Sequence, residues 1–110
     1  MTIYISGKMT GLPDLGRGAF EKAEELLRGL GYKVISPAWL KDDLPQSAYL
    51  PICMAMLDQA DAVALLPGWE SSKGAKIERD YALYQKKPVY LLAALEETVK
   101  TPIIGKVMGE

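Results

Sequence analysis

The segment 60–78, with the sequence ADAVALLPGWESSKGAKIE, contains the residues whose types and spacing could best do chemistry. Ser71 and Ser72 stand just before Gly74, where a helical pattern begins, so hydroxyls and free backbone N–H groups gather at the positive end of a helix dipole. Anions bind well at such a place. One turn further on, Glu78 falls on the helix face that carries small and aromatic side chains. A partly desolvated carboxylate beside an anion site is a candidate nucleophile or base.

Each of these residues also has a simpler interpretation, which stays open. A glutamate in the first turns of a helix is favoured by the dipole alone, and a Ser-Ser pair can be an N-cap and nothing more. The turn before the serines contains Gly68 and Trp69, which we place among the candidate substrate-binding residues. The Trp69 indole could stack on a base, or it could simply pack over a neighbouring strand.

The elements that must position these residues follow from the apolar patterns along the chain. Apolar runs predict strands at 3–5, 33–35, 62–66 and 88–92, and periodic patterns predict helices at 17–30, 49–59 and 74–85, with a short helix after Leu95. Strands that alternate with helices build a parallel sheet covered on both faces. The predicted fold class is therefore α/β, with a small parallel four-stranded sheet of order 2-1-3-4 that is Rossmann or flavodoxin-like, in a single domain over 1–110.

The predicted strand order also locates a binding site. In such sheets ligands bind beyond the carboxyl ends of the strands, at the point where the strand order reverses. That point lies between the first and third strands, which the loops 6–11 and 67–74 leave at the same edge. We expect the irregular, polar stretch 39–47 to cover this edge as a loop.

Composition excludes several classes of function. The chain has 110 residues, a formal net charge of -1, no histidine and one cysteine, Cys53. Such a charge gives no electrostatic footprint for nucleic acid or an anionic membrane. Without histidine, the usual zinc sites and the Ser-His-Asp triad are unavailable, so we expect no metal and no cofactor. With a single cysteine, no signal peptide and no apolar run of transmembrane length, a cytoplasmic location is expected.

The predicted helix 49–59 has almost no polar face. In so small a protein, a helix that is apolar all round suggests that its outer face is covered, most simply by a second copy of the chain. A homodimer or a dimer of dimers is therefore expected. The alternative is a helix that is merely well buried, since methionine is a common core filler.

The two predicted loops also carry a resemblance to known proteins. The stretches IYISGKMTGLPD (3–14) and MLDQADAVALLPGWESSKGAKIERDYAL (56–83) resemble the small bacterial and phage proteins of the DUF4406 family. That family is in turn similar to the nucleoside 2-deoxyribosyltransferases and to the 2'-deoxynucleoside 5'-monophosphate N-glycosidases. The resemblance implies that Glu78, four residues after Gly74, matches the helix glutamate that attacks the anomeric carbon of deoxyribose. Ser72 matches a serine that contacts the 5'-phosphate in the glycosidases.

The first loop contributes further matches to these enzymes. Tyr4 matches the first-strand tyrosine of the transferases, and we take it as catalytic with Glu78, while Gly7 matches the glycine after that strand. Lys8 and Thr10 fall where the glycosidases have a serine and an arginine near the phosphate, so a cation and a hydroxyl remain but in exchanged positions. The implied partner is a nucleotide or nucleoside.

One position departs from the enzymes. Both enzyme groups carry a catalytic aspartate on the helix before the third strand, and counting back from Asp61 puts Cys53 there. Cysteine is a poor replacement for a carboxylate in proton transfer at neutral pH. The acid that assists the leaving base would then have to be Tyr4, Asp58 or a loop acid, Asp42 or Asp43.

Three functions remain at this point. The first is an N-glycosidase or deoxyribosyltransferase-like protein that acts on a nucleotide or nucleoside through Glu78, and the second is a non-catalytic nucleotide-binding or sensing module. Cys53 favours the second, whereas the retained Glu78 favours the first. The third is an interaction protein built around the apolar helix, which would leave the Ser-Ser-Lys-Gly loop and Glu78 without a role.

Overall fold

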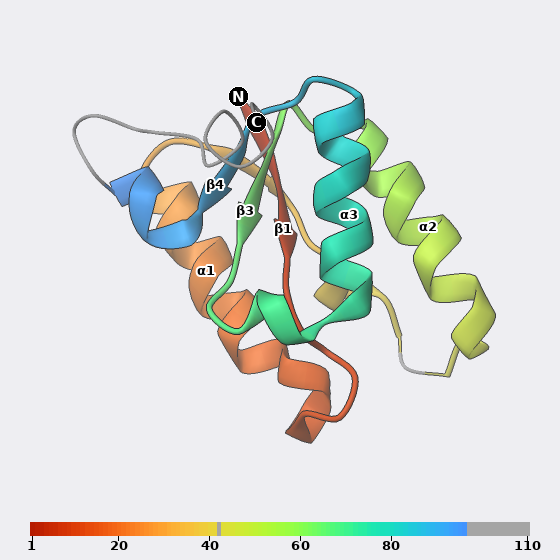
Figure 1. Ribbon diagram of the computed structural model, residues 1–110. Helices are drawn as coiled ribbons and strands as arrows, with labels where there is room; N and C mark the ends of the chain where they lie inside the picture. The colour runs from red at the N-terminus through yellow and green to blue at the C-terminus, as the bar shows by residue number, and fades with distance from the viewer. Residues whose placement is uncertain (42, 97–110) are drawn as a thin grey trace.

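The sheet has the strand order that the sequence predicts. The structure is a computed structural model that describes residues 1–41 and 43–96. Its strands are β1 (Thr2–Ser6), β2 (Lys33–Ile35), β3 (Ala62–Leu65) and β4 (Val89–Leu91). All pairs are parallel and the order is β2-β1-β3-β4, which confirms the α/β class and places β1 and β3 at the centre (Figure 1).

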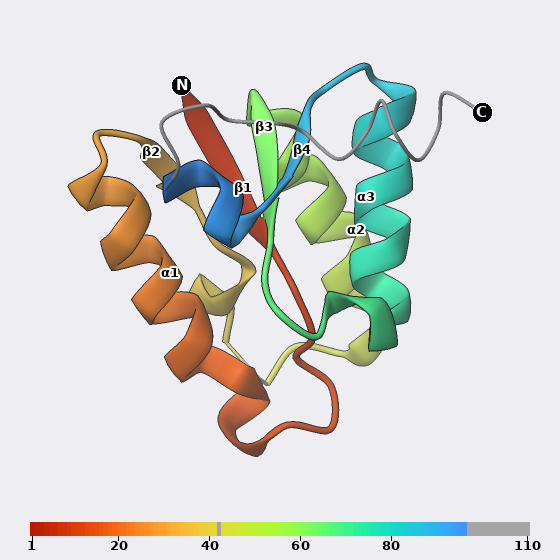
Figure 2. The same ribbon diagram turned by 60° about the vertical axis from the view of Figure 1, so that its left-hand side comes forward.

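The helices divide between the two faces of the sheet. They are α1 (Arg17–Gly29), α2 (Gln46–Asp58) and α3 (Lys73–Tyr84). Helix α1 covers one face, while α2 and α3 lie side by side on the other (Figures 1 and 2). Side chains of β1 alternate between the two layers, because successive residues of a strand point to opposite faces. Ile3 and Ile5 pack with Phe20 and Leu27 of α1, whereas Tyr4 packs with the α2 and α3 layer.

Several element boundaries differ from the sequence prediction. Helix α2 begins at Gln46, three residues before the expected start, because Pro45 has φ −57° and leads directly into the helix. The polar residues before Tyr49 therefore belong partly to the helix and not wholly to a loop. Strand β4 ends at Leu91, since a 3-10 helix begins at Leu92. The short helix expected after Leu95 lies largely outside the described residues.

The faces of α2 are less uniform than its composition suggests. Cys53 and Leu57 face the sheet and are buried, whereas Leu50 is 36% exposed. Association through this helix stays a prediction. Within the ranges that the structure describes, no helix has both the length and the apolar character needed to cross a bilayer.

Two helices end in the same hydrogen-bonded motif with different residues. At the end of α3, the N–H groups of Lys86 and Lys87 donate to the carbonyls of Leu83 and Ala82, both at 2.9 Å. This is a Schellman motif, which requires a left-handed residue at the first position after the cap. Lys86 has φ 62° there, while α1 uses Gly31 with φ 96° in the equivalent position. A lysine in this conformation costs energy that glycine does not.

We expect Lys86→Gly to raise the free energy of unfolding by about 0.5–1 kcal/mol, because glycine adopts the left-handed conformation without strain. The measurement is urea denaturation followed by circular dichroism. Lys22→Gly is the matched control: Lys22 is exposed within α1, so the same change should destabilise by about 1 kcal/mol. A loss of stability at both positions would contradict the assignment.

Candidate functional site

A cavity of about 570 Å³ lies where β1 and β3 end, at the carboxyl edge of the sheet. The loop after β1, helix α2 and the first turns of α3 form its walls. Its lining includes six residues that the sequence singled out, namely Gly7, Lys8, Thr10, Ser71, Ser72 and Gly74. The structure thus brings both predicted loops to one cavity, together with Glu78.

The carboxylate of Glu78 is buried and held through both oxygens. Helix α3 approaches the sheet closely because Ala75 and Ala82, on the same face, are small and fully buried. Glu78 is 6% exposed. Tyr4 donates its phenol hydrogen to Oε2 at 2.7 Å, and Ser6 donates its hydroxyl hydrogen to Oε1 at 2.6 Å. Charge-assisted bonds of this length are among the strong ones in proteins.

Ser6 is the functional residue that the sequence analysis missed. The sequence places it in the loop 6–11, after the predicted strand 3–5. Tyr4 and Ser6 are two residues apart in β1, so both point to the layer of α2 and α3. That alternation, extended by one residue beyond the apolar run, was the signal that could have found Ser6. Its side chain is completely buried.

The surroundings of Glu78 act on its pKa in opposite directions. Burial raises the pKa of the carboxyl, because a desolvated carboxylate is costly. Hydrogen bonds from Ser6, Tyr4 and Cys53 lower that pKa, and the net result is a raised value. Burial and the adjacent Glu78 also raise the pKa of Tyr4 far above its usual range. The phenol therefore stays protonated and serves as a donor to Glu78.

Cys53 contributes its thiol to the surroundings of Glu78. It reaches the cavity from α2 and is buried, 6% exposed, in the layer that contains Tyr4. Burial raises the pKa of the Cys53 thiol to about 11, and the neighbouring Glu78 adds to the effect. At neutral pH the thiol is protonated and releases its proton reluctantly, so it is a poor acid for a leaving base.

The cavity lining also contains cationic and hydroxyl side chains. Lys8 and Thr10 come from the loop after β1, and Ser71, Ser72 and Lys73 come from the start of α3. Ser72 is the N-cap of α3, since its Oγ accepts the N–H of Ala75 at 3.1 Å. A capping hydroxyl still has its own hydrogen to donate. Ser72 is therefore an N-cap, and its hydroxyl can still donate a hydrogen bond to an anion.

Three of the candidate site residues, Tyr4, Gly68 and Trp69, are not in the cavity lining. Tyr4 is fully buried and contacts the site through its hydrogen bond to Glu78. Trp69 packs against the α2 and α3 layer, with the guanidinium of Arg79 5.1 Å from its ring centroid. This is the packing role and a cation–π contact. Gly68 has φ 89° and forms the turn after β3, a conformation that suits glycine.

The other acids proposed from the sequence are engaged elsewhere. Asp58 accepts hydrogen bonds from Tyr81 at 2.7 Å and Gln85 at 2.9 Å, which hold its pKa below the usual range. Asp61 accepts the backbone N–H of Thr2 at 2.8 Å at the start of β1. Both carboxylates therefore tie elements together at positions outside the lining of the cavity.

The acids of the loop between β2 and α2 do not reach the cavity in the part of the chain that the structure describes. Asp43 lines a separate, more open cavity of about 350 Å³ together with Arg17 and Trp39. Asp42 lies outside the described residues. Among the residues that are described, Glu78 is the one carboxylate that lines the main cavity.

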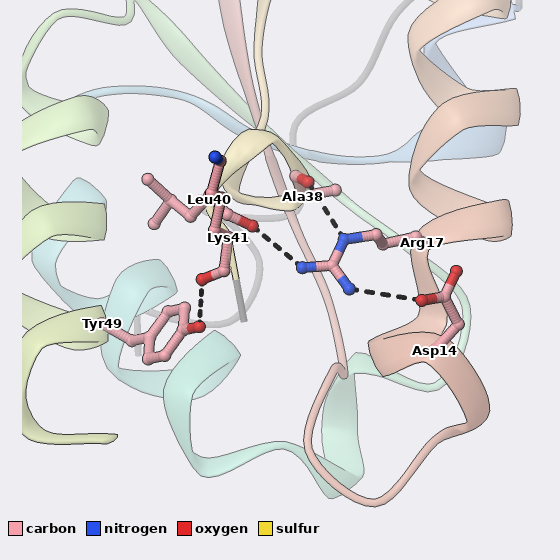
Figure 3. A network of polar contacts seen from close by, with 6 residues as sticks. All are labelled: Asp14, Arg17, Ala38, Leu40, Lys41 and Tyr49. Carbon is pink, nitrogen blue, oxygen red and sulfur yellow. Dashed lines mark hydrogen bonds and ion pairs between the residues drawn. The ribbon is translucent and has the colours of Figure 1, made fainter. Parts of the chain in front are cut away.

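The loop between β2 and α2 is held from two sides (Figure 3). Arg17, at the start of α1, donates from Nε to the carbonyl of Ala38 at 3.3 Å and from a terminal nitrogen to that of Leu40 at 2.9 Å. From α2, the phenol of Tyr49 donates to the carbonyl of Lys41. Because Tyr49 also lines the cavity, these bonds fix the wall next to Cys53.

A strained turn forms another part of the wall. Asp14, Leu15 and Gly16 follow one another with φ of 51°, 54° and 71°, so the chain makes a left-handed turn. Each residue other than glycine in this region costs roughly 1–2 kcal/mol. Arg17 pairs with Asp14 at 3.3 Å across the turn, and Leu15 contributes to the cavity lining. Strain of this kind is typical of ligand sites.

Solved structures share this fold. One is a 2-deoxyribosyltransferase from the psychrotolerant bacterium Bacillus psychrosaccharolyticus, with 21% identity, a TM-score of 0.66, and coverage of 83% of this chain and 71% of that one. Another is the solution structure of BlsM, with 20% identity, a TM-score of 0.63, and coverage of 82% of this chain and 63% of that one. This chain thus spans less than two thirds of BlsM. At such identities the likeness concerns the fold alone.

The family comparison is more direct. A search of curated proteins finds no match. The model described as "Domain of unknown function (DUF4406)" matches residues 1–91, which include all the strands and helices β1 to β4 and α1 to α3, the cavity and Glu78. The chain therefore belongs to the DUF4406 family, and its α/β fold is deoxyribosyltransferase-like.

Proposed function

We propose that this protein is an N-glycosidase or deoxyribosyltransferase-like protein that acts on a nucleotide or nucleoside through Glu78. The observation that carries the proposal is a buried carboxylate, held by Tyr4 and Ser6, that lines a cavity of about 570 Å³. A cavity of this size is within the usual range for small-molecule sites. The deoxyribosyltransferase-like fold supports the same class of substrate.

In the proposed reaction an oxygen of Glu78 attacks the anomeric carbon of the sugar. The bond from that carbon to the base nitrogen breaks through an oxocarbenium-like state, its electron pair leaves with the base, and a glycosyl ester of Glu78 results. Water then cleaves the ester in a glycosidase, whereas a second base takes the sugar in a transferase. A nucleophilic carboxylate must be ionised, and the donors Tyr4 and Ser6 favour that form.

The cationic and hydroxyl groups of the cavity lining support a preference for phosphorylated ligands. Lys8 and Lys73 supply positive charge, and Thr10, Ser71 and Ser72 supply hydroxyls. The first turn of α3 adds backbone N–H groups and the positive end of its dipole. A 5'-phosphate bound by these groups would lie in the same cavity as Glu78.

We expect Ser72→Asp to weaken the binding of nucleoside monophosphates by at least about tenfold, because it places a like charge beside the phosphate. Aspartate is as good an N-cap as serine, so α3 should stay intact. Calorimetry with matched monophosphates and nucleosides provides the measurement. Ser47→Asp, an equal charge at an exposed position in the first turn of α2, is the control. Equal losses for nucleoside and monophosphate would count against the phosphate contact.

The second candidate function is a nucleotide-binding or sensing module without turnover. Cys53 favours it, because the thiol beside Glu78 is a poor proton donor to a leaving base. One experiment separates the two functions: a panel of deoxynucleoside and ribonucleoside monophosphates is incubated with the protein, free base is followed by chromatography, and binding is followed by calorimetry. Base release that Glu78→Ala abolishes supports the enzyme, whereas binding without release leaves the sensor.

Association of two or more copies through α2 is also part of the proposal. It is supported by the apolar composition of the helix. A second copy would cover its outer face. No resident metal or cofactor is needed for the proposed chemistry.

A further inference from the structure

Ser6 has a contact that a residue with only a packing role would not need. Its hydroxyl is completely buried and lies 2.6 Å from Oε1 of Glu78, 72 residues away in the sequence. Tyr4 contacts the other oxygen from the same strand. Each of the two carboxylate oxygens of Glu78 therefore has its own hydroxyl donor from β1.

The backbone that carries Ser6 has little freedom to move. Strand β1 is paired on both sides, and the carbonyl of Ser6 accepts the N–H of Leu66 at 2.9 Å. The next residue, Gly7, is so close to Leu66 that a Cβ added to it would lie 2.9 Å from the Leu66 Cβ. The hydroxyl is therefore presented to Glu78 from a rigid support.

A hydroxyl donor on each carboxylate oxygen restrains the Glu78 side chain more than a single donor would. A glutamate has a soft terminal torsion about its last carbon–carbon bond, so a single hydrogen bond leaves the carboxylate plane free to turn. Donors on both oxygens, fixed to one strand, set that plane. We propose that Ser6 is a positioning residue, which fixes the plane of the Glu78 carboxylate by holding Oε1 while Tyr4 holds Oε2. The consequence for catalysis rests on the proposed function, whereas the anchoring itself does not.

The groups around Glu78 make this anchoring measurable. Tyr4 and Ser6 face it from β1 and Cys53 faces it from α2, while Lys8 and Lys73 line the same cavity. Hydrogen bonds to an ionised carboxylate stabilise that form, so each donor lowers the pKa that burial raises. Removing one donor should therefore raise the pKa of Glu78 further, because fewer hydrogen bonds then oppose the effect of burial.

The test is a pH titration of Glu78 by NMR, with glutamate labelled at the carboxyl carbon, in the wild type and in Ser6→Ala. The expected result is a Glu78 midpoint about one pH unit or more higher in the variant, which corresponds to at least a tenfold weaker acid. Ser6→Cys replaces the hydroxyl with a slightly larger thiol that is a weaker donor, so its midpoint should lie between the two. Ser36→Ala is the matched control, since Ser36 is an equally buried serine whose hydroxyl accepts the N–H of Ala38.

The outcomes distinguish this inference from the proposed function. A midpoint that is unchanged in Ser6→Ala, or that shifts equally in Ser36→Ala, overturns the role of Ser6 even if the protein releases base. A raised midpoint without base release from any variant supports the anchoring and leaves the enzyme without support. If base is released, Ser6→Ala should lower kcat with KM nearly unchanged, because the ligand contacts elsewhere are intact.

A second measurement applies if Ser6→Ala does not fold. In mixtures of H₂O and D₂O, the Glu78 carboxyl carbon of the wild type should show isotope shifts from the hydroxyl donors on its oxygens, and Tyr4→Phe should remove the shift that belongs to Tyr4. A shift that persists in Tyr4→Phe and becomes smaller in Ser6→Cys supports the anchor. The absence of any shift beyond that of Tyr4 contradicts it.

Discussion

Glu78→Gln should abolish base release, with a loss of more than about 10³-fold, and should make the protein more stable at neutral pH. Glutamine retains the shape and can accept one of the two hydrogen bonds that Tyr4 and Ser6 donate, while its NH₂ group requires the other hydroxyl to turn and accept. It provides no nucleophilic oxygen that could form a glycosyl ester. The loss of turnover therefore comes from the chemistry of one atom and not from a collapsed cavity. Chromatography of free base and thermal unfolding measure the two effects on the same samples.

The gain in stability follows from the raised pKa of Glu78. A carboxyl whose pKa is higher in the folded state favours folding when it is protonated, below its unfolded pKa of roughly 4.3, and loses that contribution as the pH rises through the folded pKa. At neutral pH the wild type therefore lacks the stabilisation that the raised pKa of Glu78 gives at low pH, whereas the glutamine variant has no such pH-dependent cost.

The difference in stability between the two proteins should shrink as the pH falls toward 4, where the wild-type carboxyl is protonated. Glu70→Gln is the control, because Glu70 is exposed in the turn after β3 and should change neither stability nor turnover by much. A Glu78→Gln protein that is less stable than the wild type at neutral pH would contradict the buried charge. Retained base release would remove Glu78 from the proposed mechanism.

Cys53→Asp should increase base release by at least about 100-fold, the lower range of what a positioned acid supplies. The new carboxyl would lie in the cavity beside Glu78, in the layer that contains Tyr4. Two carboxyls at such a place cannot both ionise easily, so one remains protonated to a higher pH and becomes the acid that the leaving base needs. The protein should lose about 1–3 kcal/mol of stability, because a polar group replaces a buried thiol.

Cys53→Asn separates proton transfer from polarity, because asparagine has the shape of aspartate and donates hydrogen bonds but releases no proton. It should leave base release near that of the wild type. In the double variant that combines Cys53→Asp with Glu78→Gln, the increase in base release should disappear. Base release that stays unchanged in a folded Cys53→Asp protein would show that the thiol is not what limits turnover, and it would favour a binding module.

The parts of the fold that could be predicted are those whose signals are local. The apolar strand that becomes β3 and the helix periodicity after Gly74 were enough to place Glu78 on the buried face of α3. The sequence does not identify Ser6 as a site residue, because a polar residue at a strand end usually marks the start of a loop. Its buried hydroxyl donates to Glu78, 72 residues away, and no local pattern connects these two residues.

Other site residues could not be assigned because one side chain admits several partners. Trp69 is suited both to stacking on a base and to packing; the structure shows it packed in the α2 and α3 layer with Arg79 near its ring, while base stacking stays a prediction. The sequence leaves Asp58 as a possible acid, whereas in the structure its carboxylate accepts hydrogen bonds from Tyr81 and Gln85. Such choices depend on residues distant in sequence, which periodicity does not report.

The pairing of β1 with β3 has a consequence for how the site could be assembled from separate pieces. Both hydroxyl donors to Glu78 precede the connection around Asp43, whereas Glu78 and Cys53 follow it. The halves meet along the register from Ile3 and Ala62 to Ser6 and Leu65. A break at that exposed connection divides the carboxylate from its donors, so fragment complementation between the two halves would restore the site only when the central strands recombine in register.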